Sequence, residues 1–356
     1  MMVAKPVSAE EVAEVVRAHA RISAVGGRTK PALVGEGEEL ELSGLTGITD
    51  YKASEYTFTA RAGTPVREVE EALEAKRQYL PFDPLFAESG ATLGGTVASG
   101  ACGPGRFRFG GLRDFLIGVQ FVDGAGELVR SGGRVVKNAA GFDLPKLLVG
   151  SMGRFGVMTE LSFKVFPAPS ETVTLSVACP DHGSAVERLA GVASSRWEAD
   201  ALDYDLSGKA IRLRLGGPGE ALDQICEEIE GRWPGEVERF KGAAGWRDQR
   251  EVRWARGEFL VKVPIALSGV SQLARWVDGC GGLVQCWCSS GGNVAWLSFG
   301  RNELDAVDEM LRGYSMAGLA LRGSGSSGPW LGERRANAIL GEVKEALDPG
   351  SRFPEI

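Results

Sequence analysis

The sequence predicts an α+β protein of two domains, and three observations support this class. The chain has 356 residues, which is more than a single hydrophobic core usually serves. Strand-like and helix-like segments alternate through the second half without the glycine fingerprint of a dinucleotide-binding βαβ unit. Pro167 and Pro169 follow an alternating apolar segment at 157–166 and mark a boundary between the two halves.

In the first half, capping and turn residues predict the order helix, strand, glycine turn. Ser8 and Glu11 form a capping box ahead of an apolar stripe, so a helix is expected to run to about His19. A second helix is expected to start at Thr64 as the cap, with Pro65 at the first helical position. Strands are expected at 21–25, 56–62, 119–122, 128–131 and 157–166, the third and fourth forming a hairpin.

The second half predicts helices that pack on one sheet. Strands are expected at 173–177, 211–215, 259–263, 283–288, 294–299 and 319–322. Helices are expected at 184–193, 220–231, 268–278, 303–311 and 331–347. The run from Gly323 to Gly328 matches the pattern G-x-G-x-x-G, but no strand is expected after the helix that follows it. A flexible turn is therefore favoured there over a nicotinamide-dinucleotide site.

The composition argues against several classes of protein. Hydrophobic residues make up 44% and charged residues 24%, as in globular proteins. A net charge of −7 argues against nucleic acid as the partner, because phosphate binding needs a basic face. No apolar run has the length of a membrane span, and the N-terminal segment lacks the apolar core of a signal peptide. A cytoplasmic location is therefore expected.

Cysteine and histidine usage argues against a metal site. The only histidines are His19 and His182, too few for most zinc or iron enzymes and for a Ser-His-Asp scheme. Cys280, Cys286 and Cys288 lie near one another, but their spacing fits a buried strand better than a cluster-binding run. No metal is expected.

The segment 86–118 is the most distinctive part of the chain. Nine of its 33 residues are Gly, yet it also contains leucines, valine and phenylalanines that a polar linker would lack. Its length and weak periodicity predict a functional loop. Glycine lets the backbone approach a large, flat or anionic group closely, so a bound cofactor is expected here.

Two further segments are candidates for ligand contacts. The turn from Gly26 to Lys30 follows a strand, and successive backbone amides in such a turn can cradle a phosphate, although a plain surface turn has the same pattern. The run from Gly150 to Gly156 places a Gly at every third position, as expected for backbone that winds around a ligand.

Taken in order, these segments resemble the PCMH-type FAD-binding domain of the vanillyl-alcohol oxidase superfamily. The matching runs are 25–30, 62–64, 80–84, 91–96, 113–114 and 150–160. The resemblance implies a two-subdomain FAD-binding domain at 1–167 and an α+β cap domain with an antiparallel sheet, for the substrate, at 170–330. It also implies a C-terminal helix and tail at 331–356 that packs back on the FAD domain.

The resemblance assigns non-covalent FAD contacts to individual residues. The first turn is expected to hold the pyrophosphate, the 94–100 segment to lie along the pyrophosphate and flavin, and 153–157 to lie near the adenine and ribose. Some relatives attach FAD through a His where Arg28 stands, so that link is excluded, while a thioether to Cys102 stays open. Met152 replaces the family's usual Glu. The expected contacts are Gly26, Gly27, Arg28, Thr29, Lys30, Pro84, Gly94, Gly95, Thr96, Ser99, Gly100, Gly153, Gly156 and Val157.

A further run, 131–147, resembles the smaller flavin-binding subunit of bacterial three-subunit glycolate oxidases. That resemblance implies oxidation of glycolate to glyoxylate beside a larger FAD subunit and an iron–sulfur subunit, peripheral to the inner membrane through these partners. The H-x-G-D-G-N run of larger relatives is missing. A stand-alone FAD-dependent dehydrogenase of a small 2-hydroxy acid such as D-lactate, and a flavin-free structural subunit, stay open. No catalytic base can be named among Tyr204, Arg212, Arg214, Arg247 and Arg253.

Overall fold

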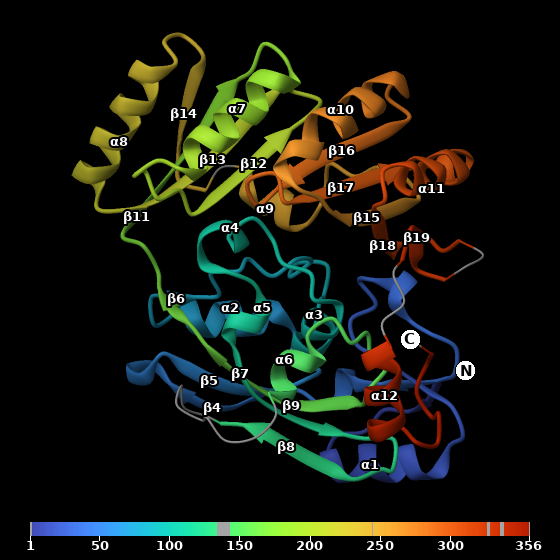
Figure 1. Ribbon diagram of the computed structural model, residues 1–356. Helices are drawn as coiled ribbons and strands as arrows, with labels where there is room; N and C mark the ends of the chain where they lie inside the picture. The colour runs from blue at the N-terminus through green and yellow to red at the C-terminus, as the bar shows by residue number, and fades with distance from the viewer. Residues whose placement is uncertain (1, 134–142, 244, 326–327, 335–337, 356) are drawn as a thin grey trace. The chain divides into compact units, whose positions relative to one another are not determined.

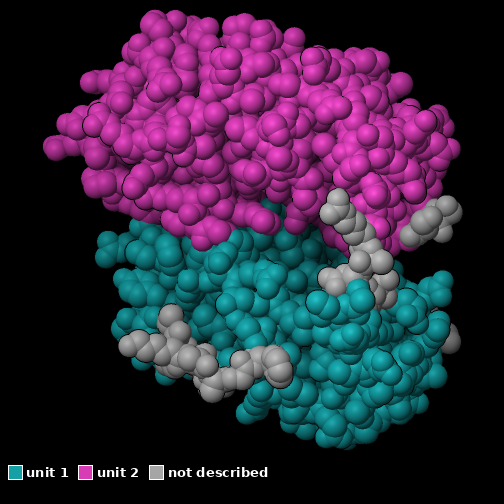
Figure 2. Space-filling view, in the orientation of Figure 1, with its two compact units in different colours: residues 1–102, 111–168, 335–356 teal, residues 103–110, 169–334 magenta. Residues whose placement is uncertain are grey.

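The computed structural model describes residues 2–133, 143–243, 245–325, 328–334 and 338–355. Helices and antiparallel sheets are both extensive, which confirms the α+β class. The chain divides into two compact units, coloured separately in Figure 2. Unit 1 comprises Met1–Cys102, Gly111–Ala168 and Arg335–Ile356, and unit 2 comprises Gly103–Gly110 and Pro169–Arg334.

Unit 1 contains two main sheets (Figure 1). Its strands are β1 (Met2–Ala4), β2 (Ile22–Val25), β3 (Glu38–Glu41), β4 (Ile48–Lys52), β5 (Thr57–Arg61), β6 (Gln78–Tyr79), β7 (Leu116–Val122), β8 (Leu128–Gly132), β9 (Val157–Lys164) and β10 (Phe166–Pro167). The larger sheet is antiparallel with the order β4-β5-β9-β7-β8, and β7 and β8 form the expected hairpin. The smaller sheet, β1-β3-β2, is parallel, and β6 pairs with β10.

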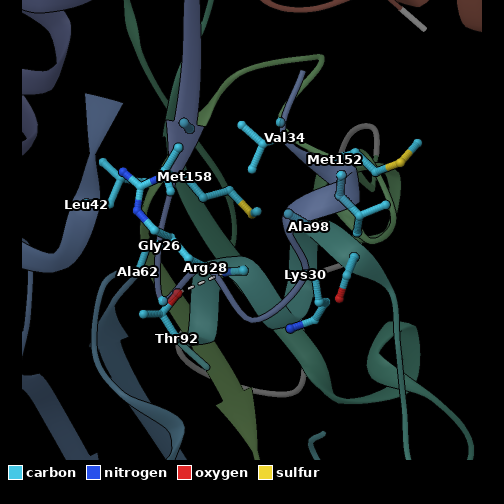
Figure 3. Close-up of a pocket in the computed structure, with 18 of the residues that line it drawn as sticks. Gly26, Arg28, Lys30, Val34, Leu42, Ala62, Thr92, Ala98, Met152 and Met158 are labelled. Atoms are coloured by element: carbon cyan, nitrogen blue, oxygen red, sulfur yellow. Dashed lines mark hydrogen bonds between the residues drawn. The ribbon is translucent and has the colours of Figure 1, made fainter. Parts of the chain in front are cut away.

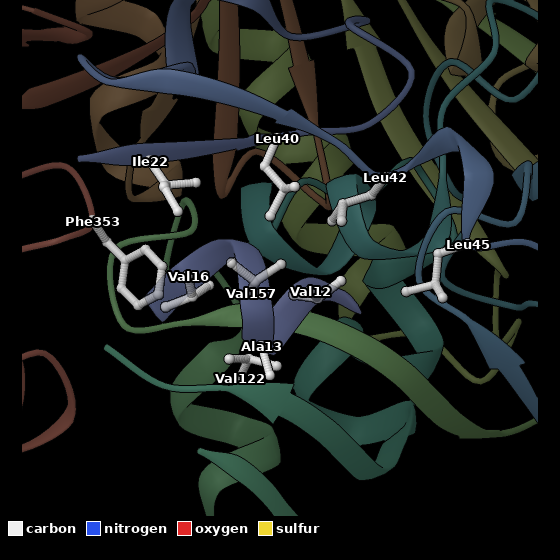
Figure 4. Packing of buried hydrophobic residues seen from close by; sticks show 10 residues of the cluster. All are labelled: Val12, Ala13, Val16, Ile22, Leu40, Leu42, Leu45, Val122, Val157 and Phe353. Carbon is white, nitrogen blue, oxygen red and sulfur yellow. The ribbon is translucent and has the colours of Figure 1, made fainter. Parts of the chain in front are cut away.

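The first helix, α1 (Ala9–Ala18), begins at the predicted capping box. Ser8 Oγ accepts a hydrogen bond of 3.1 Å from the Glu11 amide, which satisfies one of the free donors of the first turn. The apolar stripe of α1 packs into a buried cluster that includes Ile22 of β2, the strand that leads into the turn at 26–30 (Figure 4). The cluster consists of Val12, Ala13, Val16, Ile22, Leu40, Leu42, Leu45, Val122, Val157 and Phe353.

The second helix, α2 (Val66–Glu74), begins one residue later than the sequence predicted. Pro65 is its N-cap and makes no side-chain capping bond. Thr64 Oγ1 instead donates a 2.7 Å hydrogen bond to the Arg61 carbonyl. Thr64 therefore stabilises the turn between β5 and α2 rather than the helix.

The prediction of an irregular loop at 86–118 is wrong. The segment contains α3 (Leu93–Ser99), α4 (Arg106–Phe109) and α5 (Leu112–Phe115) and ends in β7. Thr92 caps α3, and Gly100 ends it in a left-handed conformation with φ of 59°. Helices of one or two turns are too short to display a helical period of apolar residues, so the sequence does not predict them.

Unit 2 is built on one sheet of nine antiparallel strands, in the order β14-β11-β13-β12-β16-β17-β15-β18-β19. The strands are β11 (Glu171–Ala178), β12 (Ala201–Asp205), β13 (Ala210–Gly217), β14 (Val237–Lys241), β15 (Phe259–Pro264), β16 (Val284–Ser289), β17 (Val294–Phe299), β18 (Ala317–Arg322) and β19 (Trp330–Gly332). The helices α7 (His182–Ala193), α8 (Gly219–Arg232), α10 (Val270–Gly279) and α11 (Leu304–Gly313) contact it, and α9 (Trp246–Arg250) is a short helix of the same unit.

All six strands expected in the second half are present, and β12, β14 and β19 were not predicted. The expected helix at 331–347 is wrong at its start, because the chain forms β19 there, and within the described residues α12 is Ala338–Leu347. Three segments that carry predictions lie outside the described residues. They are 335–337, part of the run at 323–328, and the 134–142 part of the run 131–147. The remaining helix of unit 1, α6 (Leu144–Leu148), follows that gap.

Candidate functional site

A glycine-lined cleft lies within unit 1 and contains about 740 Å³ of empty space, open solvent included. Three segments form its walls: the chain from β2 through the turn at 26–30, helix α3 with Thr92 before it, and the stretch 152–158 (Figure 3). Ten of the fourteen expected contact residues line it, namely Gly26, Gly27, Arg28, Thr29, Lys30, Gly94, Gly95, Ser99, Gly153 and Gly156.

The turn after β2 requires glycine at its start. A Cβ at Gly27 would lie 1.7 Å from the Gly90 carbonyl oxygen, and one at Gly26 would lie 2.3 Å from Thr92 Oγ1. Arg28 then turns the chain with a left-handed φ of 53°. Among the residues that the structure describes, the amides of Gly27, Arg28 and Thr29 have no acceptor. Consecutive free amides around a left-handed residue form a concavity that suits an anion.

Two cations border this turn, and each already has a neighbour. Arg28 donates two hydrogen bonds, of 3.1 and 2.7 Å, to the carboxylate of Glu39 on β3. These bonds hold the pKa of Glu39 below its ordinary value. The buried Lys30 Nζ donates to Thr29 Oγ1 at 3.0 Å and lies 5.3 Å from the centre of the Phe86 ring. Arg28 is therefore paired with Glu39, whereas the side chain of Lys30 is held against the cleft wall.

Helix α3 gives the second wall. Thr92 Oγ1 accepts a 3.2 Å hydrogen bond from the Gly95 amide and so fixes the first turn of the helix. Gly94 packs against Ala62, whose carbonyl lies 3.0 Å from the position of a Cβ. A Cβ at Gly95 would meet only Thr92 Oγ1, at 3.2 Å. The wall is therefore flat backbone beside open space at Gly95.

The third wall, at 152–158, is fixed against the second. The amide of Met152 donates to the Ala98 carbonyl at 2.8 Å, and the amide of Gly150 donates to the Val97 carbonyl at 2.9 Å. Met152 has a left-handed φ of 53°, and Gly153 follows with φ of 73° and open space around it. Because Met152 stands where the resembling family has Glu, this wall offers an apolar thioether instead of a carboxylate.

Four expected contact residues do not line the cleft. Val157 belongs to the buried cluster, and Gly100 caps α3. Thr96 is buried, and its Oγ1 has no partner among the described residues. Pro84 pairs with Cys102 in an isolated bridge, and Cys102 Sγ accepts a 3.4 Å hydrogen bond from the Leu112 amide. Cys102 is likewise absent from the cleft lining.

The apolar part of the lining was predicted only in part. Val25, Ala62, Met152 and Met158 lie in the matching runs and Ala98 lies in the 94–100 segment, but none of them was named as a contact. Ala24, Leu33, Val34 and Leu42 lie outside those segments, where small or apolar residues are equally typical of a core. Thr92 also lines the cleft; it lies within the matching run 91–96 but was not named as a contact.

Unit 2 contains a buried polar cluster that the sequence did not predict. The Asp203 carboxylate on β12 accepts hydrogen bonds from Trp287 Nε1 at 2.8 Å, Ser289 Oγ at 2.7 Å and the Ser290 amide at 3.3 Å. Burial raises its pKa to about 6, against the opposing effect of these donors. Ionisation of a carboxyl group in this range makes Asp203 a candidate for pH-dependent behaviour.

His182, isolated in the sequence, is paired in the structure. Its Nδ1 lies 2.6 Å from the Tyr204 hydroxyl and its Nε2 lies 2.8 Å from Asp278 Oδ2. Tyr204 is buried, which raises its pKa. The Tyr204 phenol is fully buried and does not reach a substrate. The two hydrogen bonds of His182 therefore serve to tie α7, β12 and α10 together. Among the described residues, no group of three or more His, Cys, Asp or Glu side chains could hold a metal ion.

Comparison with known proteins defines the class of the cleft-bearing part. Residues 1–132 match the family model for the FAD binding domain, so this part is an FAD-binding domain of the PCMH type and its cofactor is FAD. The free amides of the turn and the flat glycine wall fit a diphosphate and a planar ring. The structure shares its fold with alkyldihydroxyacetonephosphate synthase, at a TM-score of 0.70 and 16% identity over 97% of this chain and 74% of that one.

The chain is similar to several curated flavoprotein relatives. Glycolate oxidase subunit GlcE of Escherichia coli is 41% identical over 200 residues, 55% of each chain. D-2-hydroxyglutarate dehydrogenase of Xanthomonas citri is 35% identical over 51% of this chain and 40% of its own. D-lactate dehydrogenase of Anaerostipes hadrus is 32% identical over 48% of this chain and 37% of its own. The chain thus spans about half the length, or less, of these relatives.

None of the described helices is both long enough and apolar enough to cross a bilayer.

Proposed function

We propose that this chain is an oxidoreductase and the FAD-binding subunit of a glycolate oxidase complex, taking part in the oxidation of glycolate to glyoxylate. The observation that carries the proposal is the glycine-lined cleft, which lies in the domain matched as FAD-binding. The 41% identity to glycolate oxidase subunit GlcE supports the substrate and the complex.

The cleft residues have separate tasks in this proposal. The free amides at 27–29 donate to the FAD pyrophosphate, and Lys30 offsets its negative charge. Gly94 and Gly95 let the cofactor approach α3, while Leu33, Leu42 and Met158 exclude water. When bound, FAD accepts two electrons as a hydride and can pass them on singly.

The charge of the cleft favours an accessory role beside other subunits. Among the described residues that line it, Arg28 and Lys30 are the only ionisable ones, so it offers no carboxylate or imidazole as a base. The hydroxyl proton of a 2-hydroxy acid is most often removed by a His, Asp or Glu side chain. We therefore propose that a larger FAD subunit and an iron–sulfur subunit work with this chain, in the cytoplasm, and connect it to the inner membrane.

A second candidate is a stand-alone FAD-dependent dehydrogenase of a small 2-hydroxy acid. Its support is the similarity to D-2-hydroxyglutarate and D-lactate dehydrogenases. A flavin-free structural subunit is the third candidate, since glycine-rich turns also serve a bare fold.

Anaerobic reduction of the reconstituted protein separates these candidates. The purified chain is incubated with FAD, desalted and mixed with glycolate, D-lactate or D-2-hydroxyglutarate, and the flavin absorbance is followed. The accessory role predicts a yellow protein that glycolate bleaches only when the partner subunits are present. Bleaching by a hydroxy acid without partners would support the stand-alone enzyme, and a chain that stays colourless would leave the structural subunit.

A further inference from the structure

Lys344 on α12 is a lysine buried inside unit 1. Its side chain is 10% exposed, and its ammonium group has four oxygen neighbours. Nζ donates to the carbonyls of Arg154 at 2.8 Å, Phe353 at 3.0 Å and Pro354 at 3.1 Å, and to Asp348 Oδ2 at 2.7 Å. A buried ammonium is costly unless it is paired and hydrogen-bonded, and here both conditions are met. The lysine therefore joins three parts of the chain at one point.

One of these parts is the third wall of the cleft. Arg154 lies between the lining residues Gly153 and Gly156, and Lys344 donates a hydrogen bond to its carbonyl. The buried Arg154 guanidinium extends the same connection, because Nε donates to the Glu355 carbonyl at 2.6 Å and Nη1 to the Met152 carbonyl at 3.1 Å. Both the backbone and the side chain of this wall are therefore bound to the C-terminal tail.

The same tail also supports the first wall. The Ile22 amide at the start of β2 donates to the Arg352 carbonyl at 2.7 Å, and Phe353 packs in the buried cluster around β2. Pro354 fits against Gly35, where a Cβ would lie 2.3 Å from a proline carbon. Gly35 follows the lining residue Val34. The tail at 348–355 thus contacts two of the three walls.

Asp348 completes the arrangement. It is fully buried, and besides Lys344 its carboxylate accepts hydrogen bonds of 2.9 Å from the amides of Arg352 and Phe353. These bonds fold the tail back toward α12, so that the carbonyls of Phe353 and Pro354 reach the ammonium. Lys344 is the only described donor that binds the third wall, Asp348 and the tail together.

We propose that Lys344 is a positioning residue for FAD: through the carbonyl of Arg154 and the C-terminal tail, it holds the 152–156 wall and the β2 turn at the separation that the cofactor needs. This inference rests on the cleft being the FAD site. Loss of the ammonium lets the 152–156 wall move, so the cofactor must order that wall when it binds, and affinity falls.

The test measures FAD binding by the purified chain, through quenching of flavin fluorescence. The variant Lys344→Met/Asp348→Asn removes the ammonium without leaving a buried unpaired carboxylate. We expect its FAD dissociation constant to rise at least about tenfold while its far-UV circular dichroism stays unchanged. Lys344→Arg, which retains charge and donors, is expected to recover most of the affinity. The control Lys52→Met, which changes a surface lysine paired with Glu55, should bind FAD like the wild type.

A second measurement needs no variant. Binding at the cleft and order in the tail must affect each other reciprocally. FAD should therefore slow hydrogen exchange of the Arg352 and Phe353 amides several-fold in the wild type. Unchanged exchange there, or unchanged affinity in the double variant, overturns the positioning role while leaving the proposed function standing. A wild-type chain that binds no FAD overturns both.

Discussion

At Gly95 the helix backbone faces open space in the cleft, so a single methyl group tests whether the cofactor lies there. The position of its Cβ is 3.2 Å from Thr92 Oγ1 and has no other atom nearby, so Ala requires Thr92 to move by a few tenths of an ångström, while the helical backbone suits Ala. We expect Gly95→Ala to raise the FAD dissociation constant about tenfold, because the methyl occupies space that a flat ligand needs.

Fluorescence titration with FAD measures this effect, and Gly231→Ala is the matched control. Gly231 also lies in a helix, α8, with open space around its Cβ position, but it belongs to unit 2. The control should leave FAD affinity unchanged and stabilise the helix slightly. Equal affinity of both variants for FAD would place the cofactor away from α3.

Also at the scale of residues, the sequence predicted the cleft lining where glycine is sterically required. Gly26 and Gly27 could be predicted from the sequence because any side chain at these positions would clash with Thr92 or Gly90. Neighbours of lining residues were harder to assign, because adjacent positions of a helix or strand point in different directions. Thr96 and Val157 therefore point into the core although the residues beside them line the cleft.

At the scale of elements, β12 shows why some strands were missed. Its five residues include Asp203 and Asp205, and carboxylates are unfavourable in strands. The strand forms because tertiary contacts satisfy Asp203 through Trp287, Ser289 and Ser290, none of which is near in sequence. By contrast, the strands β15 and β17 were predicted because apolar residues dominate them, with only Lys262 and Ser298 as polar residues.

The same strand carries a prediction about pH. Burial raises the pKa of Asp203 from 3.8 to about 6. Between pH 3.8 and about 6, the folded state therefore keeps a proton on Asp203 that the unfolded chain has already released. The contribution of Asp203 to the free energy of unfolding therefore falls as pH rises from 4 to 6, by about 2–3 kcal/mol, and is constant above that range.

Asp203→Asn removes this titration, so the stability difference between wild type and variant should change by that amount over the same interval. Urea unfolding at several pH values from 4 to 7 measures it. Two stability curves that stay parallel through this range would show that the Asp203 carboxyl ionises at its ordinary pKa.

At the scale of the whole molecule, each unit is assembled from segments that are distant in sequence. Residues 103–110 belong to unit 2, where Arg108 donates to Asp200 at 3.1 Å and a Cβ at Gly291 would lie 2.7 Å from the Phe107 ring. The C-terminal segment belongs to unit 1 through Lys344 and Phe353. No local sequence pattern predicts to which unit such a segment belongs, because this depends on contact partners about 90 to 340 residues away. The resemblance implied that the C-terminal segment packs on the FAD domain, but it included 103–110 in that domain rather than in unit 2.

This division supplies the last prediction, because all eight tryptophans lie between Trp197 and Trp330, in unit 2, whereas the described cleft lies in unit 1. Tryptophan emission therefore follows the unfolding of unit 2, and hydrogen exchange of β7 and β9 peptides follows unit 1. FAD at 100 times its dissociation constant adds about 2.7 kcal/mol to the unit that binds it. In urea titrations we expect FAD to move the exchange midpoint of the β7 and β9 peptides to higher urea and to leave the tryptophan midpoint in place. An equal shift of both midpoints would mean that the cleft in unit 1 does not account for the binding energy on its own.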